Sequence, residues 1–302
     1  MIPRMPAVVA VATVVALGIT ACGGSNTHGD SPGAGGKIAV VASTDVWGAV
    51  ASAVGGDQVA VTSILHDPSA DPHSYETTPS DVLAFTRAQL ALGNGGGYDD
   101  FFTKLSEQAP NTRKLVAYDI ARDAGATDDN EHVWYSFTAV EKVADSLVGQ
   151  LGTLRPEAAQ TFTANANAFK AKVEALAADT ARIGDAHPGT KVLVTEPVPH
   201  YLIQTAKLTD ATPEAFSTAV ENETDVPAAA LAEVNRLISA KEVKAVLNND
   251  QTVTPTTTQV VGTATKAGVP VVGVTETLPK GAVDYISWMT GQVKALAGAV
   301  GS

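Results

Sequence analysis

Four polar residues at comparable positions in the two halves of the chain could together bind a metal ion. His73 and Glu196 each follow an apolar run with the character of a β-strand, one in each half. His132 and Asp284 each lie in a loop ahead of an expected helix. Two imidazoles with two carboxylates form a donor set that suits Zn²⁺, Mn²⁺ or Fe²⁺. We therefore expect a metal site if the two halves face each other across a cleft.

His73 lies between two prolines, in a loop that follows the apolar run Val59–Leu65. Pro72 restricts the backbone directly before it, and Pro79 lies near the first turn of a helix that begins at about Ser80. Open α/β sheets bind ligands outside the carboxyl ends of their strands, which is where this loop lies. A rigidly placed imidazole suits a metal ligand, although an isolated Asp-Pro-His sequence is more often an exposed turn.

Each of the other three residues also has an ordinary structural interpretation. Glu196 precedes a proline and could be an acidic residue at a helix entry. Asp284 could cap the N-terminus of a helix. His132 could simply pack against Trp134. Spacing alone supports these interpretations at least as well as ligation, so the metal hypothesis depends on the combination.

Alternating apolar runs and amphipathic segments predict an α/β fold with a parallel sheet in each of two lobes. In the first half we expect strands at 37–44, 59–65, 88–92 and 115–118, and helices at 45–54, from about 80, around 101–102 and at 138–151. In the second half we expect strands at 192–195, 243–247 and 269–274, and helices at 201–208, 227–239, 255–266 and 285–300.

Residues 155–185 form one long helical pattern with an apolar stripe made of Phe162, Phe169, Val173, Leu176 and Ile183. At about 1.5 Å per residue this helix would be about 45 Å long, which exceeds most helices inside a compact domain. An ordinary surface helix would also fit the pattern, but the mid-chain position favours a rigid connection. We expect lobes at 37–153 and 188–302, joined by a linking helix at 154–187.

The composition narrows the class of function. The chain has 302 residues, 45% of them apolar, and a formal net charge of −12, which argues against the basic face that nucleic-acid binding needs. The single cysteine argues against an internal disulfide and against a multi-cysteine zinc site. The glycines within 93–97 suggest the dinucleotide-binding fingerprint G-x-G-x-x-G. Tyr98 occupies the position of the last glycine in that fingerprint, so we interpret the segment as a tight loop.

The only cysteine, Cys22, stands at the end of an expected export signal. Arg4 precedes an apolar run at 7–19 that is shorter than the roughly 20 residues needed to span a bilayer, so we expect a signal peptide at 1–21. The run Leu17–Cys22 resembles a bacterial lipobox, whose cysteine becomes the lipidated first residue. An ordinary signal peptide with an incidental cysteine is the alternative. Residues 22–36 are rich in small and polar residues and are expected to form a flexible tether.

Several motifs, taken in order, resemble those of the substrate-binding proteins of zinc and manganese ABC transporters, the cluster A-I group. They are DPHSYE at 71–76, PSD at 79–81, EHVW at 131–134, TEPV at 195–198, TETLP at 275–279 and DYISWM at 284–289. The ordered combination is specific and covers nearly all of the chain after the signal peptide. In that family one metal ion lies between two α/β lobes joined by a long, stiff helix. The resemblance implies that His73, His132, Glu196 and Asp284 are the ligands.

The chain departs from the family pattern at two places that bear on the metal. Zinc-dedicated members often have a third histidine where this chain has Glu196, and many carry a histidine-rich loop, whereas the loop at 127–131 is short and acidic. Two histidines with two carboxylates can bind Mn²⁺, while intrinsic affinity is higher for zinc. The EHVW motif and Leu278-Pro279 are closer to zinc-associated relatives, so we expect zinc ahead of manganese, with iron left open.

His200 is the rival of Glu196 as the third ligand. Pro197 and Pro199 disfavour a regular helix between the two residues, so their side chains should separate. Glu196 directly follows an expected strand, where the backbone is best fixed. We therefore expect His200 to be a neighbour of the site, at most hydrogen-bonded to a ligating carboxylate.

The resemblance implies a monomeric extracytoplasmic receptor, anchored to the cell membrane by a lipid on Cys22, that delivers its ion to an ABC permease and ATPase. One alternative is a metal-dependent hydrolase in the same cleft, with His200 or Glu76 as its general base. A second alternative is a surface adhesin, which should bind its partner without metal. We expect a binding protein and not an enzyme, with no nucleic-acid partner.

Overall fold

Parallel β-sheets and the helices that cover them position the candidate residues. The structure is a computed structural model that describes residues 1, 36–67, 72–73 and 75–301, of which those from Lys37 onward group into one compact unit. The expected signal peptide at 1–21 and Cys22 lie outside the described residues apart from Met1, and the expected tether at 22–36 does so apart from Gly36. Among the described helices, none combines the length and apolar character that crossing a membrane requires.

The first sheet has the strand order β2-β1-β3-β4, and all of its pairs are parallel. Its strands are β1 (Ile38–Thr44), β2 (Val59–Leu65), β3 (Leu90–Gly93) and β4 (Arg113–Val116). The helices of this N-terminal lobe are α1 (Asp45–Gly55), α2 (Pro79–Arg87), α3 (Asp100–Gln108), α4 (Ala117–Asp123) and α5 (Phe137–Leu154), with short 3₁₀ turns at Gly56–Gln58 and Val133–Tyr135. Helices cover both faces of β1, which explains why its first five residues, at 38–42, are all apolar.

The second sheet repeats this arrangement with the order β6-β5-β7-β8, again all parallel. Its strands are β5 (Lys191–Val194), β6 (Thr209–Asp210), β7 (Val246–Asn249) and β8 (Val271–Val274). The helices of this C-terminal lobe are α7 (His200–Thr205), α8 (Glu214–Glu221), α9 (Ala228–Ser239), α10 (Pro255–Ala267) and α11 (Tyr285–Val300). The predicted fold class, two α/β lobes that each contain a parallel sheet, is confirmed.

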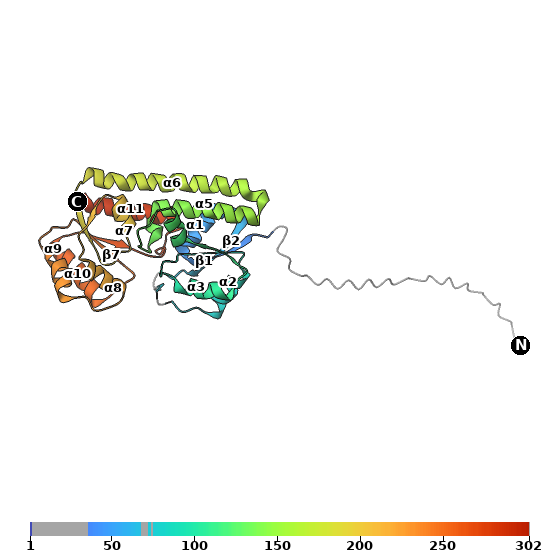
Figure 1. Cartoon of the computed structure of the whole chain (residues 1–302), viewed down its shortest axis with the longest axis horizontal. Helices are drawn as coiled ribbons and strands as arrows, with labels where there is room; N and C mark the ends of the chain where they lie inside the picture. The colour runs from blue at the N-terminus through green and yellow to red at the C-terminus, as the bar shows by residue number, and fades with distance from the viewer. Residues whose placement is uncertain (2–35, 68–71, 74, 302) are drawn as a thin grey trace. The chain divides into compact units, whose positions relative to one another are not determined.

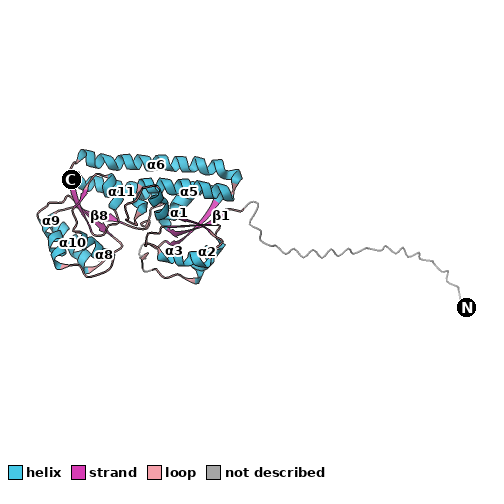
Figure 2. Cartoon of the chain, viewed as in Figure 1, coloured by secondary structure: helices cyan, strands magenta, loops and turns pink. Residues whose placement is uncertain are grey.

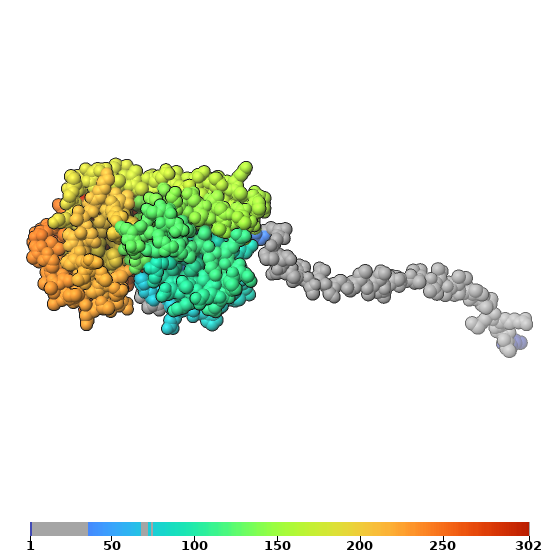
Figure 3. Space-filling view, in the orientation of Figure 1, coloured from blue at the N-terminus to red at the C-terminus, as the bar shows by residue number. Residues whose placement is uncertain are grey.

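The 28-residue helix α6 (Ala159–Ala186) connects the lobes, and a 3₁₀ turn at Pro156–Ala158 precedes it. Figure 1 shows α6 extending along both lobes beside α5 and α11. The five residues of its predicted apolar stripe are all buried. In the space-filling view α6 forms a yellow-green to yellow band along one edge of both lobes (Figure 3). The single long connecting helix predicted from the sequence is therefore present.

One apolar cluster runs through both lobes. It includes residues of α5, α6 and α11, the helices that Figure 2 shows along one side of both lobes. It contains Trp47 of α1, Phe169 of α6, Val194 of β5 and Trp288 of α11. Two smaller clusters lie on the other face of each sheet, one under α2 and α3 and the other under α8, α9 and α10. The lobes thus share a hydrophobic core, which fixes how their sheets face each other.

The structure also contains elements that the sequence patterns did not predict. They are α4, the two-residue strand β6, and α8. The strand expected at 115–118 is also displaced, because β4 ends at Val116 and Ala117 already begins α4. Of these differences, α8 matters most for function because it ends at Glu221.

Candidate metal site

A cavity of about 550 Å³ lies beyond the carboxyl ends of the strands and is lined by residues of both lobes. The lining residues are His73, Gly96, Gly97, Glu131, Glu196, Glu221, Asn222, Glu223, Gln251, Thr252, Val253, Thr254 and Glu276. Carboxylates are the common feature of this set, and no lysine or arginine belongs to it. A cavity of this character favours a cation.

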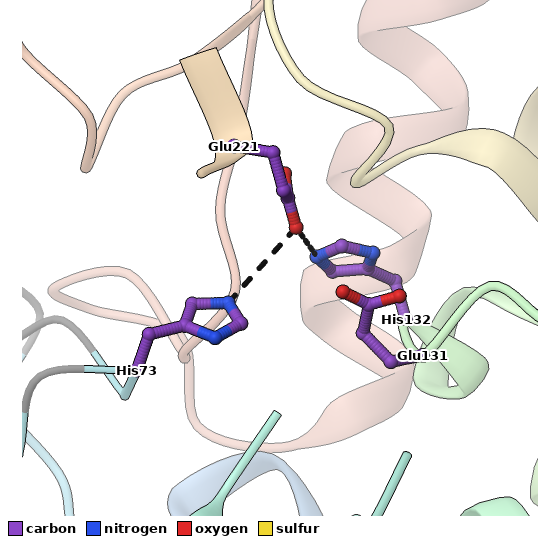
Figure 4. A group of neighbouring side chains, drawn as sticks. All are labelled: His73, Glu131, His132 and Glu221. Carbon is purple, nitrogen blue, oxygen red and sulfur yellow. Dashed lines mark ion pairs between the residues drawn. The ribbon is translucent and has the colours of Figure 1, made fainter. Parts of the chain in front are cut away.

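Two imidazoles and two carboxylates come together at this cavity in a group that could hold a metal ion. The group consists of His73, Glu131, His132 and Glu221, and one possible ligand atom from each lies within 4.8 Å of the others. Figure 4 shows the Glu221 carboxylate between the two imidazole rings. Its Oε1 lies 3.4 Å from Nε2 of His132 and 4.0 Å from Nε2 of His73. Both Nε2 atoms therefore face one point.

His132 is fully buried, and its ring is held from its other nitrogen. Nδ1 lies 3.1 Å from Oδ1 of Asn130, and the backbone N–H of His132 donates to the same oxygen at 2.9 Å. Burial, followed by the nearby charges of His73 and His200, lowers the pKa of His132 to about 3. The imidazole is therefore neutral at physiological pH, as a metal ligand must be.

The carboxyl group of Glu221 has a strongly raised pKa. Burial is the main cause, and the charges of Glu196, Glu131 and Glu276 add to it. In the metal-free protein this group therefore carries a proton at neutral pH. The same causes show that four carboxyl groups lie close enough together to repel one another, and a divalent cation would relieve that repulsion.

Glu196 and Glu276 occupy matching positions in the C-terminal lobe. Each follows its strand by one intervening threonine, β5 for Glu196 and β8 for Glu276, and both side chains are buried. Oε1 of Glu276 accepts a hydrogen bond of 2.7 Å from Nδ2 of Asn249, and Gln251 Oε1 accepts from the Glu276 backbone N–H at 2.5 Å. Contacts from the end of β7 thus fix the position of Glu276.

Aromatic rings pack around the two imidazoles. The Tyr98 ring lies edge-on to His73 at 5.2 Å and to His132 at 6.0 Å between centroids, and Trp134 lies edge-on to His132 at 5.1 Å. Tyr98 follows three glycines with positive φ, at 95, 96 and 97. The glycine-rich segment is therefore a tight turn that places Tyr98, which agrees with the interpretation made from the sequence.

Asp284 lies elsewhere, and the structure does not bring it to the histidine pair. Its side chain is the N-cap of α11, where a carboxylate oxygen accepts from the Ser287 N–H at 2.7 Å. It is exposed and lines a different cavity, together with Phe169 and Lys172 of α6. The contacts of Asp284 therefore show a helix N-cap, which is the structural interpretation that we considered for this residue.

The two residues considered as general bases do not line the cavity either. His200 is the first residue of α7, and its Nε2 lies 2.9 Å from Oδ2 of Asp128. Glu76 is exposed. Of the predicted ligands, His73 and Glu196 line the cavity, and His132 belongs with His73 to the four-residue group, which does not include Glu196. The structure adds three carboxylates that were not predicted as ligands, those of Glu131, Glu221 and Glu276.

Curated relatives share moderate sequence similarity with this chain. The manganese-binding lipoprotein MntA of Bacillus subtilis is 28% identical over 166 residues, which is 52% of this chain and 53% of the relative. The iron ABC transporter substrate-binding lipoprotein MtsA of Streptococcus pyogenes serotype M1 is 27% identical over 171 residues, or 52% of this chain and 55% of the relative. The chain thus spans about half the length of the curated relatives it matches.

Solved structures share the fold. The periplasmic zinc-binding protein TroA of Treponema pallidum superposes with a TM-score of 0.74 at 17% identity, covering 88% of this chain and 99% of TroA. A crystal structure of ZnuA gives a TM-score of 0.73 at 20% identity, covering 88% and 100%. At this level of identity the likeness shows the fold alone.

A family model described as ZnuA, zinc-uptake complex component A periplasmic, matches residues 40–299. That range contains both sheets apart from the first two residues of β1, together with the linking helix and every residue that lines the cavity. Members of this family are substrate-binding proteins and not enzymes, which argues against the hydrolase hypothesis. The chain belongs to the ZnuA family of metal-uptake proteins.

Proposed function

We propose that this protein is the metal-binding receptor of an ABC import system, which holds one divalent ion between its lobes and delivers it to a membrane permease. The observation that carries the proposal is the convergence of His73 and His132 on one point in a cavity lined by carboxylates of both lobes. Family membership and the manganese- and iron-binding names of the relatives support it. The adhesin alternative would instead require partner binding without metal.

The proposed ligands are His73, His132, Glu196 and Glu276, the last in place of Asp284. Glu276 lies at the cavity and follows β8 as Glu196 follows β5, whereas the Asp284 carboxylate caps a helix. This set takes two ligands from each lobe. Glu221 Oε1 already lies near both Nε2 atoms, so an ion bound there must either replace its proton or displace its side chain.

The proposed cargo is zinc or manganese. Two imidazoles and two carboxylates can hold zinc tetrahedrally, and the further carboxyl oxygens of Glu131 and Glu221 could complete the larger, oxygen-rich shell that manganese prefers. Intrinsic affinity should be higher for zinc. We therefore expect competition between the two ions to favour zinc in vitro, whichever ion the cell supplies.

The test is the metal content of untagged protein purified without chelator, followed by competitive chelator titrations. We expect one ion per chain, with Glu196→Ala losing most of the affinity and His200→Ala losing at most about 10- to 100-fold. If His200→Ala abolishes binding and Glu196→Ala has almost no effect, the site is a three-histidine zinc site. The absence of stoichiometric binding would exclude the receptor function itself.

The proposed location is the outer face of the cell membrane, with Cys22 as the lipid-bearing residue. We predict that Cys22→Ser releases the protein from the membrane fraction, because Cys22 ends an export signal too short to span a bilayer. Fractionation of cells followed by detection of the processed protein measures this. A processed Cys22→Ser protein that still sediments with membranes and is released only by detergent would contradict the proposal.

A further inference from the structure

Asn130 connects the ring of His132 to the segment that carries Glu196. Its Oδ1 accepts from the His132 backbone N–H at 2.9 Å and lies 3.1 Å from Nδ1 of the same residue. Its Nδ2 donates to the carbonyl oxygen of Pro197 at 3.2 Å. These contacts fix the orientation of the Asn130 side-chain amide. Only its Nδ2 can donate to the Pro197 carbonyl, so its Oδ1 must face the two nitrogens of His132.

This orientation determines the tautomer of His132. An amide oxygen only accepts, so Nδ1 must carry the proton when it bonds to Asn130. In a neutral imidazole the lone pair then lies on Nε2, the atom that faces Glu221 Oε1 and His73 in the cavity. Without Asn130, nothing in these contacts would prevent the proton from residing on Nε2, where it would block ligation.

We propose that Asn130 is a positioning residue for the metal site: it holds His132 in the Nδ1–H tautomer and sets the placement of that ring relative to Glu196. The inference rests on the proposed function, since it assigns Asn130 to the same site. Histidine ligands in metalloproteins generally donate their second nitrogen to an oxygen acceptor. Here the acceptor belongs to a side chain whose other end is hydrogen-bonded to the opposite lobe.

The backbone of Asn130 is also held from the C-terminal lobe. Tyr201 of α7 donates its hydroxyl to the Asn130 carbonyl at 2.7 Å, and that hydroxyl lies 2.5 Å from Oγ1 of Thr127. Asp129 has a φ of 77°, a turn conformation that aspartate tolerates. Asn130 therefore has both its backbone and its side chain fixed, which is what positioning a ligand requires.

The experiment compares three variants of the full chain. Asn130→Ala removes both amide functions, whereas Asn130→Asp keeps the acceptors for His132 and removes the donor for Pro197. Asn165→Ala is the matched control, because it removes a comparable bond, from Nδ2 to the Val54 carbonyl at 3.1 Å, on α6. The readouts are the His132 tautomer, from the ¹⁵N chemical shifts of labelled histidine in metal-free protein, and zinc affinity from chelator competition.

We expect the Nδ1–H tautomer in the parent, in Asn130→Asp and in the control, and a substantial Nε2–H population in Asn130→Ala. Zinc affinity should fall about 10- to 100-fold in Asn130→Ala and remain unchanged in the control. An Nε2–H tautomer in the parent, or unchanged tautomer and affinity in Asn130→Ala, would overturn the proposal. The tautomer is read without metal, so it distinguishes this failure from a parent protein that does not bind zinc at all.

Discussion

Glu276 and Asp284 belong to one segment of the chain, but their carboxylates have different neighbours. Glu276 is buried at the cavity and accepts a hydrogen bond from Asn249. Asp284 is exposed and accepts from the backbone of Ser287 in a capping box. Their substitution should therefore affect different properties, metal affinity in the first case and helix stability in the second.

We predict that Glu276→Gln weakens zinc binding by at least about 10-fold, because it removes a proposed ligand charge while keeping the shape of the side chain. Asp284→Ala should leave zinc affinity unchanged and lower the free energy of unfolding by about 1 kcal/mol, the usual cost of losing an N-cap. Chelator competition and urea denaturation measure the two quantities. If Asp284→Ala weakened zinc binding and Glu276→Gln did not, Asp284 would be a ligand and Glu276 would not.

The raised pKa of Glu221 predicts proton release when metal binds. In the metal-free protein the group is protonated at pH 7.5, and a divalent ion among the same carboxyl groups favours the ionised form. Affinity should consequently rise with pH as long as the pH stays below the raised pKa. Calorimetry in buffers of different ionisation enthalpy should show about one proton more released by the parent than by Glu221→Gln.

Glu214→Gln, at the other end of α8, is the control for this measurement. It lies outside the cavity and should release as many protons as the parent. Equal proton release by the parent and Glu221→Gln would mean that Glu221 keeps its proton or is already ionised in the metal-free protein.

At the scale of elements, the sequence predicted those that depend on apolar periodicity. The strands β1, β2 and β8 and the helices α6 and α11 carry strong apolar patterns and lie within a few residues of their expected bounds. The strand β6 could not be predicted in this way, because its two residues, Thr209 and Asp210, are polar and exposed. The helix α8 is short, and its signal was Phe216, Ala219 and Val220 at helical spacing after Pro213.

The candidate site was predictable where a proposed ligand follows a recognisable strand. This rule indicated Glu196, and applied to β8 it would also have indicated Glu276, which we propose in place of Asp284. No local rule indicated Glu221, because it ends an unpredicted helix and reaches the histidines only through the packing of the two lobes. The polar contacts of Asn130 likewise depend on tertiary structure, since its partner Pro197 comes from the other lobe.

At the scale of elements, we also predict the effect of changing the contact between α6 and the residues that follow α7. A methyl group on Gly184 would come within 2.6 Å of Lys207 Cβ and would clash with the Ala206 carbonyl, whereas Gly149 of α5 has open space around it. Gly184→Ala should lower the free energy of unfolding by about 1–3 kcal/mol. Gly149→Ala should raise it by about 0.5–1 kcal/mol, since alanine favours the helix. A stabilised Gly184→Ala protein would show that α6 is not tightly packed there.

At the scale of the whole molecule, the lobes are joined by more than one helix. The Tyr135 hydroxyl donates to the Thr275 carbonyl at 2.9 Å, and the Tyr285 hydroxyl donates to the Trp134 carbonyl at 2.8 Å. Together with the apolar cluster that runs through both lobes, these two hydrogen bonds oppose wide opening. A hinge of the kind that separates two domains would have to break them.

We therefore predict that metal release changes the relation between the lobes only slightly. Small-angle scattering curves of metal-free and metal-loaded protein should nearly superimpose, with local rearrangement of cavity side chains as the main difference. A large change in the radius of gyration would contradict the shared core as the constraint on lobe movement.

The packing of α11 against helices from earlier in the chain affects the order in which the protein can fold. This last helix packs on α6, on β8 and on α1, and the Leu278 N–H just ahead of it donates to Asp45, 233 residues earlier in the chain. Contacts between such distant segments form late, because the intervening loop must close first. The packing around α1 therefore cannot be completed until residues 278–300 have been synthesised, so we expect the candidate site to form only after α11 is in place.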